Sequence, residues 1–533
     1  MNVRYRVFLV LSLIAVAVFS SLGNVGAATE DDSSVAQVAS SGGVSAMNRD
    51  DGGLETLPDA GLPVMGKGSG SDGATARVAG NEKKDIEGIW EGSLDVNGSK
   101  LRVVFHISRA EDGSLTATLD SPDQGATGIP VSKVTFEGGK LVVNVDVAMA
   151  MFEGQANGDL SSIDGNWKQR GMTFPLKLER VKEAPKMSRP QEPKKPYPYK
   201  EEEVTIENKV GGVELAGTLT IPKGKPPFPA VVLITGSGPE DRDETVFGHK
   251  PFLVLADYLT RRGVAVLRVD DRGVGGSSGD LWSSTSRDFA GDVEAEVRYL
   301  MGRKEIDAER IGLIGHSEGG IIAPMVAVDM KNIAFIVLMA GPGVPGDSIL
   351  YHQSALIAKA EGASEEEIAK NRLLQEKAFA IVEGTTDDAA AREKLEALFA
   401  GEYGHLDKDQ RSAAPDSARL IEAQTRRILN PWFRYFLTYD PAETLRKVKC
   451  PVLAIGGEKD LQVPADENLE AIREALKAGG NGDFIVKKLP GLNHLFQTAE
   501  TGDVSEYSKI EETISPVALK LIGDWIVGHV SGD

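Results

Sequence analysis

The chain has 533 residues, of which 41% are hydrophobic, and its formal net charge is −20. This length exceeds what a single hydrophobic core usually serves, so we expect two or three domains. The excess of acidic residues argues against nucleic acids and anionic membrane surfaces as partners, because both would repel the chain.

Residues 1–27 have the pattern of a signal peptide. Arg4 and Arg6 precede an apolar run at 7–19, and small residues at 25–27 resemble a cleavage site. The apolar run is too short to span a bilayer. The pattern therefore predicts an exported protein, periplasmic or extracellular, with no stable membrane insertion after cleavage; an uncleaved anchor is the alternative. Cys450 is the single cysteine, so no internal disulfide can form.

Residues 28–84 are rich in Gly, Ser, Ala and Asp and predict a disordered linker. In residues 85–182, short alternating segments such as LRVVFHIS and KLVVNVDV are separated by turn residues, which predicts an all-β barrel-like domain. The GIW triplet at 88–90 resembles the opening of lipocalin-like barrels. The prolines in MSRPQEPKKPYPY indicate an extended linker over 183–200.

Strands and helices alternate over residues 201–530. A hairpin is expected from EVTIEN and VELAGTLTIP, and six apolar runs follow at 230–235, 264–270, 310–315, 334–340, 451–456 and 483–489. Such runs are typical of strands buried on both faces of a mostly parallel sheet, and the amphipathic stretches between them predict an α/β domain. Three helical patterns predict a helical cap at about 345–440, inserted between the fourth and fifth of these strands, or else a peripheral packing layer.

The pattern G-x-S-x-G occurs twice, at 275–279 and at 315–319. A catalytic serine in an α/β-hydrolase lies on a sharp turn directly between a strand and a helix. The segment around Ser317 supplies strand, turn and helix without a gap, whereas Ser277 follows its strand at a distance. We therefore predict Ser317 as the nucleophile.

A serine hydroxyl is a weak nucleophile and needs a base and an orienting acid. Asp460 follows the strand at 451–456, and His494 follows the strand at 483–489, in the chain order that this fold uses. Both lie where ligands bind in open α/β sheets, at the carboxyl ends of strands. Glu458 is the competing acid. The other candidate bases, His249, His316, His352 and His405, lie in poorer positions.

The oxyanion of an acyl-transfer reaction needs N–H donors. The N–H of Glu318, which follows the nucleophile, is one predicted donor. The second is expected in GSGPEDRDE after the strand at 230–235, from Ser237 or else from Gly236.

Residues 200–530 resemble the α/β-hydrolases of the serine-aminopeptidase-like group, close to bacterial carboxylesterases, in GHSEGG, GSGPEDRD, DDRGVGGSSG and GLNH. The resemblance implies a serine hydrolase that cleaves carboxylic esters. An amide hydrolase with the same triad and a non-catalytic ligand-binding protein are the alternatives. Asp270, Asp271 and Arg272 are expected to form a structural ion network. The chain has no zinc or Walker motif, so we expect neither a metal nor another cofactor.

Overall fold

The computed structural model describes residues 85–531, apart from 97–98, 111, 125, 170–171, 185–187 and 405–416. The predicted signal peptide (1–27) and disordered linker (28–84) lie outside the described residues, as does His405. In the described part of the chain, no helix is both long and apolar enough to cross a bilayer.

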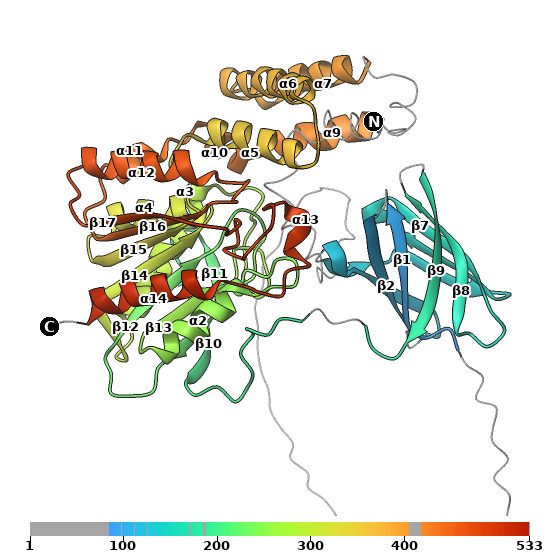
Figure 1. Ribbon diagram of the computed structural model, residues 1–533, viewed down its shortest axis with the longest axis horizontal. Helices are drawn as coiled ribbons and strands as arrows, with labels where there is room; N and C mark the ends of the chain where they lie inside the picture. Colours follow the sequence, from blue (N-terminus) through green and yellow to red (C-terminus); the bar gives the residue numbers. More distant parts are fainter. Residues whose placement is uncertain are drawn as a thin grey trace, which may run out of the picture. The chain divides into compact units, whose positions relative to one another are not determined.

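The first domain is a single antiparallel sheet of nine strands, which curls around an apolar interior (Figure 1). The strands are β1 (Gly88–Val96), β2 (Ser99–Arg109), β3 (Leu115–Ser121), β4 (Ala126–Pro130), β5 (Lys133–Glu137), β6 (Lys140–Val145), β7 (Ala150–Ala156), β8 (Ser162–Gln169) and β9 (Met172–Val181). The order in the sheet is β4-β3-β2-β1-β9-β8-β7-β6-β5. Aromatic side chains fill the interior, among them Trp90, Phe105, Phe152 and Trp167.

The second domain is built on a sheet of eight strands in the order β10-β11-β13-β12-β14-β15-β16-β17. The strands are β10 (Lys200–Asn208), β11 (Val213–Ile221), β12 (Phe228–Ile234), β13 (Ala265–Val269), β14 (Ile306–His316), β15 (Ile333–Met339), β16 (Val452–Gly457) and β17 (Phe484–Leu489). Strands β10 and β11 form the expected hairpin, and the later strands pair in parallel. All six apolar runs of the sequence are strands of this sheet.

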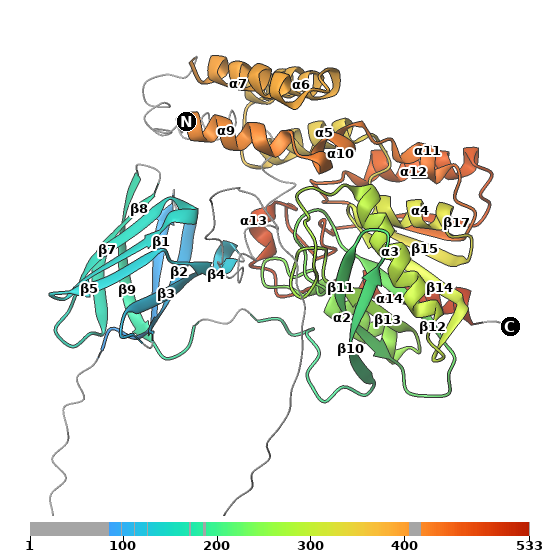
Figure 2. The ribbon, with the colours of Figure 1, turned by 180° about the vertical axis from the view of Figure 1, so that it is seen from behind.

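Helices cover both faces of the eight-stranded sheet (Figures 1 and 2). On one face lie α2 (Pro251–Arg261) and α14 (Pro516–Val530); on the other lie α3 (Ser286–Met301), α4 (Gly319–Asp329) and α12 (Ala465–Ala478). Strand β12 shows why its sequence is continuously apolar. Val231 and Leu233 pack into the first face, and Val232 and Ile234 pack into the second.

A helical insertion separates β15 from β16. It comprises α5 (Gly346–Ala360), α6 (Glu365–Gly384), α7 (Asp388–Gly404), α9 (Ser417–Ile428), α10 (Pro431–Thr438) and α11 (Pro441–Leu445). Helix α6 begins at a capping box, because the Ser364 side chain accepts from the Glu367 N–H while the Glu367 carboxylate accepts from the Ser364 N–H. The rings of Tyr351, Phe379 and Phe433 join α5, α6 and α10, with centroids 5.1 and 5.8 Å apart.

Residues 188–191, within the predicted Pro-rich linker, are bound to the second domain. The Arg189 guanidinium donates to backbone carbonyls of that domain, those of Phe247, Gly248, Ser508 and Ile510. The Gln191 side chain makes three further hydrogen bonds, with the backbone of Thr513 and Ile514. We call residues 188–191 the strap. It ties the chain that follows β17 to the loop that precedes α2.

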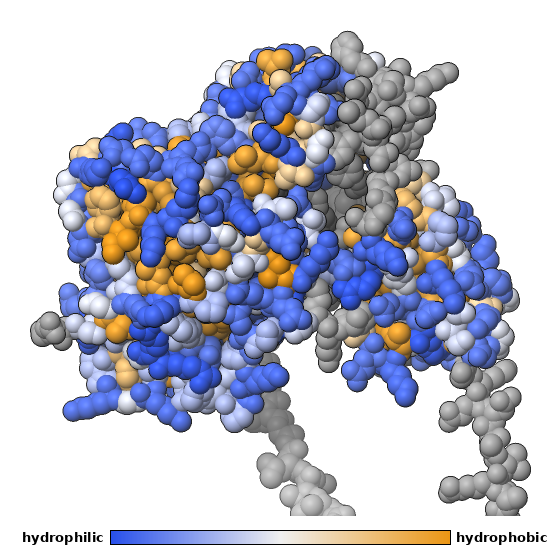
Figure 3. All heavy atoms as spheres, in the orientation of Figure 1, coloured by the Kyte–Doolittle hydropathy of each residue, from blue (hydrophilic) through white to orange (hydrophobic). Residues whose placement is uncertain are grey.

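Apolar side chains gather on one face of the second domain, over the edge strand β17 and helix α14 (Figure 3). Ile485 of β17 and Val517 of α14 are among the exposed large hydrophobic residues. The fold thus leaves one edge of the parallel sheet uncovered, away from β14.

Candidate active site

Ser317 lies on a sharp turn between β14, which ends at His316, and α4, which begins at Gly319. Its φ is +52°, a left-handed conformation that is unfavourable for serine and that characterises a nucleophile elbow. The turn tolerates only glycine on either side. A Cβ on Gly315 would lie 1.9 Å from the Gly319 carbonyl oxygen, and one on Gly319 would lie 2.3 Å from the Ile234 carbonyl oxygen. The glycines of G-x-S-x-G at 315–319 are therefore required by packing.

Ser277, in the second match to G-x-S-x-G, has a structural environment. Its hydroxyl donates to the Asp270 carbonyl at 2.7 Å and accepts from the Ala216 N–H at 2.9 Å. The residue is buried and its φ is not left-handed. Its hydroxyl therefore holds a loop in place.

Asp460 and His494 meet as expected from the sequence. The His494 Nδ1 lies 2.8 Å from Asp460 Oδ2, and both side chains are buried. The other oxygen, Oδ1, accepts from the N–H groups of Gln462 and Val463, which fixes the orientation of the carboxylate. The competing acid, Glu458, is exposed and accepts instead from the Gly491 N–H.

His316 links the nucleophile turn to the segment that carries His494. Its Nε2 donates to the His494 carbonyl at 3.0 Å, and the two imidazole centroids are 4.9 Å apart. No hydrogen bond joins the Ser317 hydroxyl to the His494 imidazole in this structure, although both residues are described. Hydrogen bonds of this kind often tighten only when substrate binds. His316, which directly precedes Ser317, thus connects the serine turn to the backbone of His494.

Glu244 completes this connection and was not identified from the sequence. Its Oε1 accepts from His316 Nδ1 at 2.8 Å and from the Gly236 N–H at 3.0 Å. Burial alone would lower the pKa of His316, but the charge and hydrogen bond of Glu244, together with the His494 carbonyl, raise it above its usual value. The pair is buried. It fastens the turn after β12 to the nucleophile turn.

The expected oxyanion donors lie beside Ser317. A Cβ on Gly236 would be 3.3 Å from the Ser317 Cβ, so the turn after β12 runs directly along the nucleophile. The Gly236 N–H, the alternative donor, donates to Glu244 in this structure. Within the described chain, nothing accepts from the Glu318 N–H. The assignments of Ser237 and Glu318 stay predictions.

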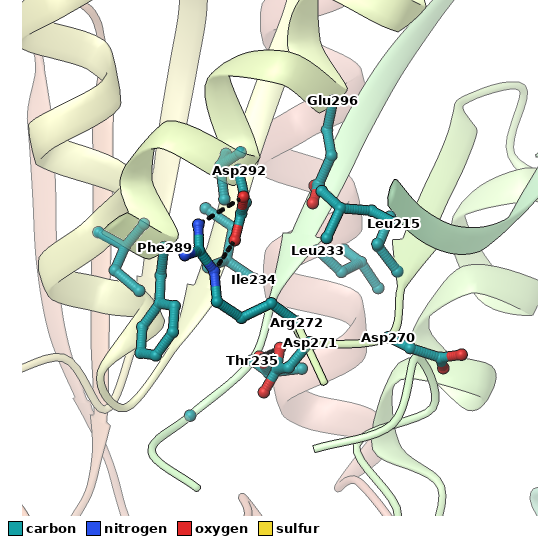
Figure 4. Close-up of a pocket in the computed structure, with 14 residues that line it drawn as sticks. Leu215, Leu233, Ile234, Thr235, Asp270, Asp271, Arg272, Phe289, Asp292 and Glu296 are labelled. Carbon is teal, nitrogen blue, oxygen red and sulfur yellow. Dashed lines mark hydrogen bonds and ion pairs between the residues drawn. The ribbon is translucent and has the colours of Figure 1, made fainter. Parts of the chain in front are cut away.

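The segment DDRGVGGSSG forms ion pairs below this turn. Asp270 pairs with Arg242 at 2.8 Å, and Arg272 pairs with the buried Asp292 at 2.7 Å. Asp271 accepts from the Thr235 hydroxyl. Asp270, Asp271, Arg272 and Asp292 line a cavity of about 40 Å³, which has room for a few ordered waters (Figure 4).

This cavity contains two carboxyl groups whose pKa burial raises well above the usual value, those of Asp271 and Glu296. Neither Ser317, Asp460 nor His494 lines it. The cavity therefore belongs to the support of the turn after β12. In the described ranges, no group of three or more His, Cys, Asp or Glu side chains could hold a metal ion.

Two of the alternative bases, His249 and His352, have structural contacts. His249 is fully buried between Thr513 and the Tyr507 carbonyl, and burial, followed by the charge of Arg189, lowers its pKa to about 4. His352 pairs with Glu467. Neither residue contacts the turn of Ser317.

Comparison with known proteins places this site in a family. Residues 211–488 match the family of X-Pro dipeptidyl-peptidases (S15 family). The esterase EstD of Thermotoga maritima is 28% identical over 305 residues, which are 57% of this chain and 62% of that protein. This chain therefore spans less than two thirds of the length of that relative.

Solved α/β-hydrolase structures also resemble the chain. The α/β-hydrolase GrgF from Penicillium sp. sh18 covers 63% of this chain and 100% of its own, with 17% identity and a TM-score of 0.40. The esterase Pf2001 of Pyrococcus furiosus covers 63% of this chain and 94% of its own, with 15% identity and a TM-score of 0.36.

Proposed function

This chain belongs to the X-Pro dipeptidyl-peptidase (S15) family, and we propose that, as a serine hydrolase of this class, it cleaves carboxylic esters through an acyl-enzyme. The observation that carries the proposal is the serine turn beside a paired imidazole and carboxylate. Ser317 has the strained conformation of a nucleophile, and Asp460 holds the Nδ1 side of His494, which leaves Nε2 for the serine.

In the proposed mechanism, Ser317 Oγ attacks the ester carbonyl carbon while His494 Nε2 takes the hydroxyl proton. The oxyanion accepts hydrogen bonds from the N–H groups of Glu318 and Ser237. When the tetrahedral intermediate collapses, His494 gives its proton to the departing alcohol. Water then attacks the acyl-enzyme by the same route, and Asp460 stabilises the imidazolium throughout.

An amide substrate is the second candidate, because the matched family contains dipeptidyl-peptidases. Cleavage at a free N-terminus requires a carboxylate that can bind the substrate ammonium. Four buried carboxylates around the serine turn already accept hydrogen bonds from protein groups: Glu244, Asp271, Glu318 and Asp460. Esters have the better leaving group and are therefore the first candidate.

The third candidate is a non-catalytic binding protein whose β-domain carries an apolar ligand. The interior of that domain is filled by side chains such as Trp90, Phe105 and Phe152, all fully buried. This packing speaks against an apolar ligand at the centre of the curled sheet. The secretion expected from residues 1–27 stays a part of the proposal.

The test is labelling with a fluorophosphonate together with hydrolysis of p-nitrophenyl acetate. Ser317→Ala is expected to lose the label and to lower kcat/KM at least about a thousandfold. Ser277→Ala is the matched control, because it removes the serine of the other G-x-S-x-G. It is expected to keep the label, since the Ser277 hydroxyl only holds a loop in place. Retained activity in Ser317→Ala would refute the assignment. Comparison of the ester with an X-Pro p-nitroanilide separates the first two candidates.

A further inference from the structure

The side chain of Glu318, next to the nucleophile, points to the helical insertion. Its carboxylate is buried, and Oε1 accepts from the Ser286 hydroxyl at 2.5 Å and from the Trp432 indole N–H at 2.7 Å. Ser286 is the first residue of α3, and Trp432 lies in the first turn of α10. A single carboxylate oxygen therefore joins the nucleophile turn, a core helix and the insertion.

Helix α10 is held at a defined place. Its N-terminus is capped by the Asn430 side chain, which accepts from the Phe433 N–H, and Pro431 occupies the first helical position. A Cβ on Gly346, at the start of α5, would lie 1.9 Å from the Phe436 carbonyl oxygen of α10. Because two helices of the insertion touch through a glycine, α10 has little freedom to shift.

The insertion also begins beside the nucleophile helix. A Cβ on Gly320 would lie 2.5 Å from the Gly341 Cα, in the turn that leaves β15 for the insertion. Phe433 and Phe436 of α10 are buried, whereas Trp432 is only partly buried and stacks on Phe436 at 5.2 Å. Trp432 thus combines a fixed backbone with an accessible indole surface.

The distance from Trp432 to the reacting carbonyl follows from covalent geometry. The oxyanion would accept from the Glu318 N–H, and the carboxylate of the same residue accepts from the indole. The oxyanion oxygen and the indole nitrogen are therefore separated by two hydrogen bonds and the length of one extended glutamate. Together these limit the distance between the two atoms to roughly 10 Å. An extended acyl or alcohol group of roughly eight carbons spans this distance, so a group of that length that lies toward the insertion reaches the indole.

We propose that Trp432 is a specificity-determining wall of the substrate site, and that Glu318 is the positioning residue that holds it there. The inference rests on the proposed esterase function, since it concerns the same nucleophile. The indole limits the length of the substrate group that lies beneath the insertion. The Glu318 oxygen keeps the indole in that position, and Ser286 holds the oxygen from the other side.

The charges around Glu318 agree with a positioning role. Burial raises the pKa of Glu318 to about 6, against the hydrogen bonds of Ser286 and Trp432, so the group is ionised at neutral pH. An ionised acceptor makes a stronger hydrogen bond to the indole than a neutral one. The charged or titratable groups that face this region are Asp271 in the segment after β13 and Tyr435 on α10.

The experiment measures kcat and KM for two series of p-nitrophenyl and alkyl esters, one that lengthens the acyl group and one that lengthens the alcohol. Trp432→Ala is expected to raise kcat/KM for long relative to short esters at least about tenfold in one series. Trp432→Phe keeps the ring but loses the N–H, and Glu318→Leu loses the acceptor. Both variants are expected to weaken the discrimination between long and short esters, and to do so mainly through KM.

Two controls separate this role from a general loss of structure. Glu318→Gln keeps an acceptor oxygen and is expected to restore the chain-length preference. Trp525→Phe replaces a buried tryptophan on the opposite face of the sheet and is expected to retain the wild-type chain-length preference. The inference fails if the wild type hydrolyses esters and Trp432→Ala and Trp432→Phe leave both series unchanged. An inactive wild type would instead contradict the proposed function.

Discussion

Glu318→Gln should make the stability of the hydrolase domain less dependent on pH. The Glu318 carboxyl has an ordinary pKa of 4.5 in the unfolded chain and a pKa of about 6 in the folded protein, because burial favours the neutral form. Between these two pKa values the folded state therefore binds more protons than the unfolded state. The contribution of Glu318 to the free energy of unfolding is largest below pH 4.5 and is lost as the pH rises through about 6. The full difference corresponds to about 2 kcal/mol.

The wild type should lose roughly 1.2 kcal/mol of this contribution to its free energy of unfolding between about pH 5 and about pH 8. Glutamine does not titrate, so Glu318→Gln should gain that much stability relative to the wild type as the pH is raised. The measurement is urea unfolding, with the unfolded fraction at each urea concentration monitored by pulse labelling of Cys450 with 4,4′-dithiodipyridine. Cys450 is the single cysteine of the chain and precedes β16, so its labelling reports on the hydrolase domain alone.

The native thiol should react slowly, because burial raises the pKa of Cys450 to about 11. Glu214→Gln, which removes an exposed carboxylate of β11, is the control and should shift the urea midpoint equally at both pH values. The argument would be refuted if the free energy of unfolding of Glu318→Gln, relative to the wild type, did not change with pH or decreased as the pH rose. It would mean that Ser286 and Trp432 stabilise the charge more than burial destabilises it.

Three further predictions concern the support of the site. Asp292→Asn should destabilise the hydrolase domain by about 3 to 5 kcal/mol in the same unfolding assay, because Arg272 is left buried without a counter-charge; a loss below 1 kcal/mol, roughly the value of an exposed ion pair, would contradict this. Gly320→Ala should cost about 1 to 3 kcal/mol and lower kcat, since its Cβ displaces Gly341; unchanged ester kinetics would speak against the close contact. Arg189→Ala should speed proteolysis of the segment that follows His494, which limited digestion and mass spectrometry would detect; an unaltered digest would show that the strap is dispensable.

The sequence carried most of the fold of the hydrolase domain. Strands buried on both faces must be apolar throughout, so the runs at 230–235 and 334–340 could be recognised without any neighbour, and the structure places β12 and β15 there within two residues. The cap of α6 at Ser364 could also be read locally, because a capping box needs only residues close in sequence. The exact domain boundaries stay predictions.

The candidate site divides in the same way. Ser317 was recognisable because an elbow requires glycines at fixed offsets, and Asp460 and His494 because each follows its own strand. The choice of Asp460 over Glu458 needed the structure, since both residues lie on one turn and only the path of the backbone decides which carboxylate reaches the imidazole. Ser277 is similar: its hydroxyl is satisfied by backbone groups that the sequence does not bring together.

The sequence by itself indicated the candidate residues for acyl transfer, because strand, turn and helix signals are local. Only the tertiary structure decided what supports them. Glu244 pairs with His316 across 72 positions of the chain, and Glu318 binds Trp432 across 114. Such contacts leave no periodic pattern in the sequence. Their hydrogen bonds are strengthened by the low dielectric of the interior, which exists only after the chain has folded.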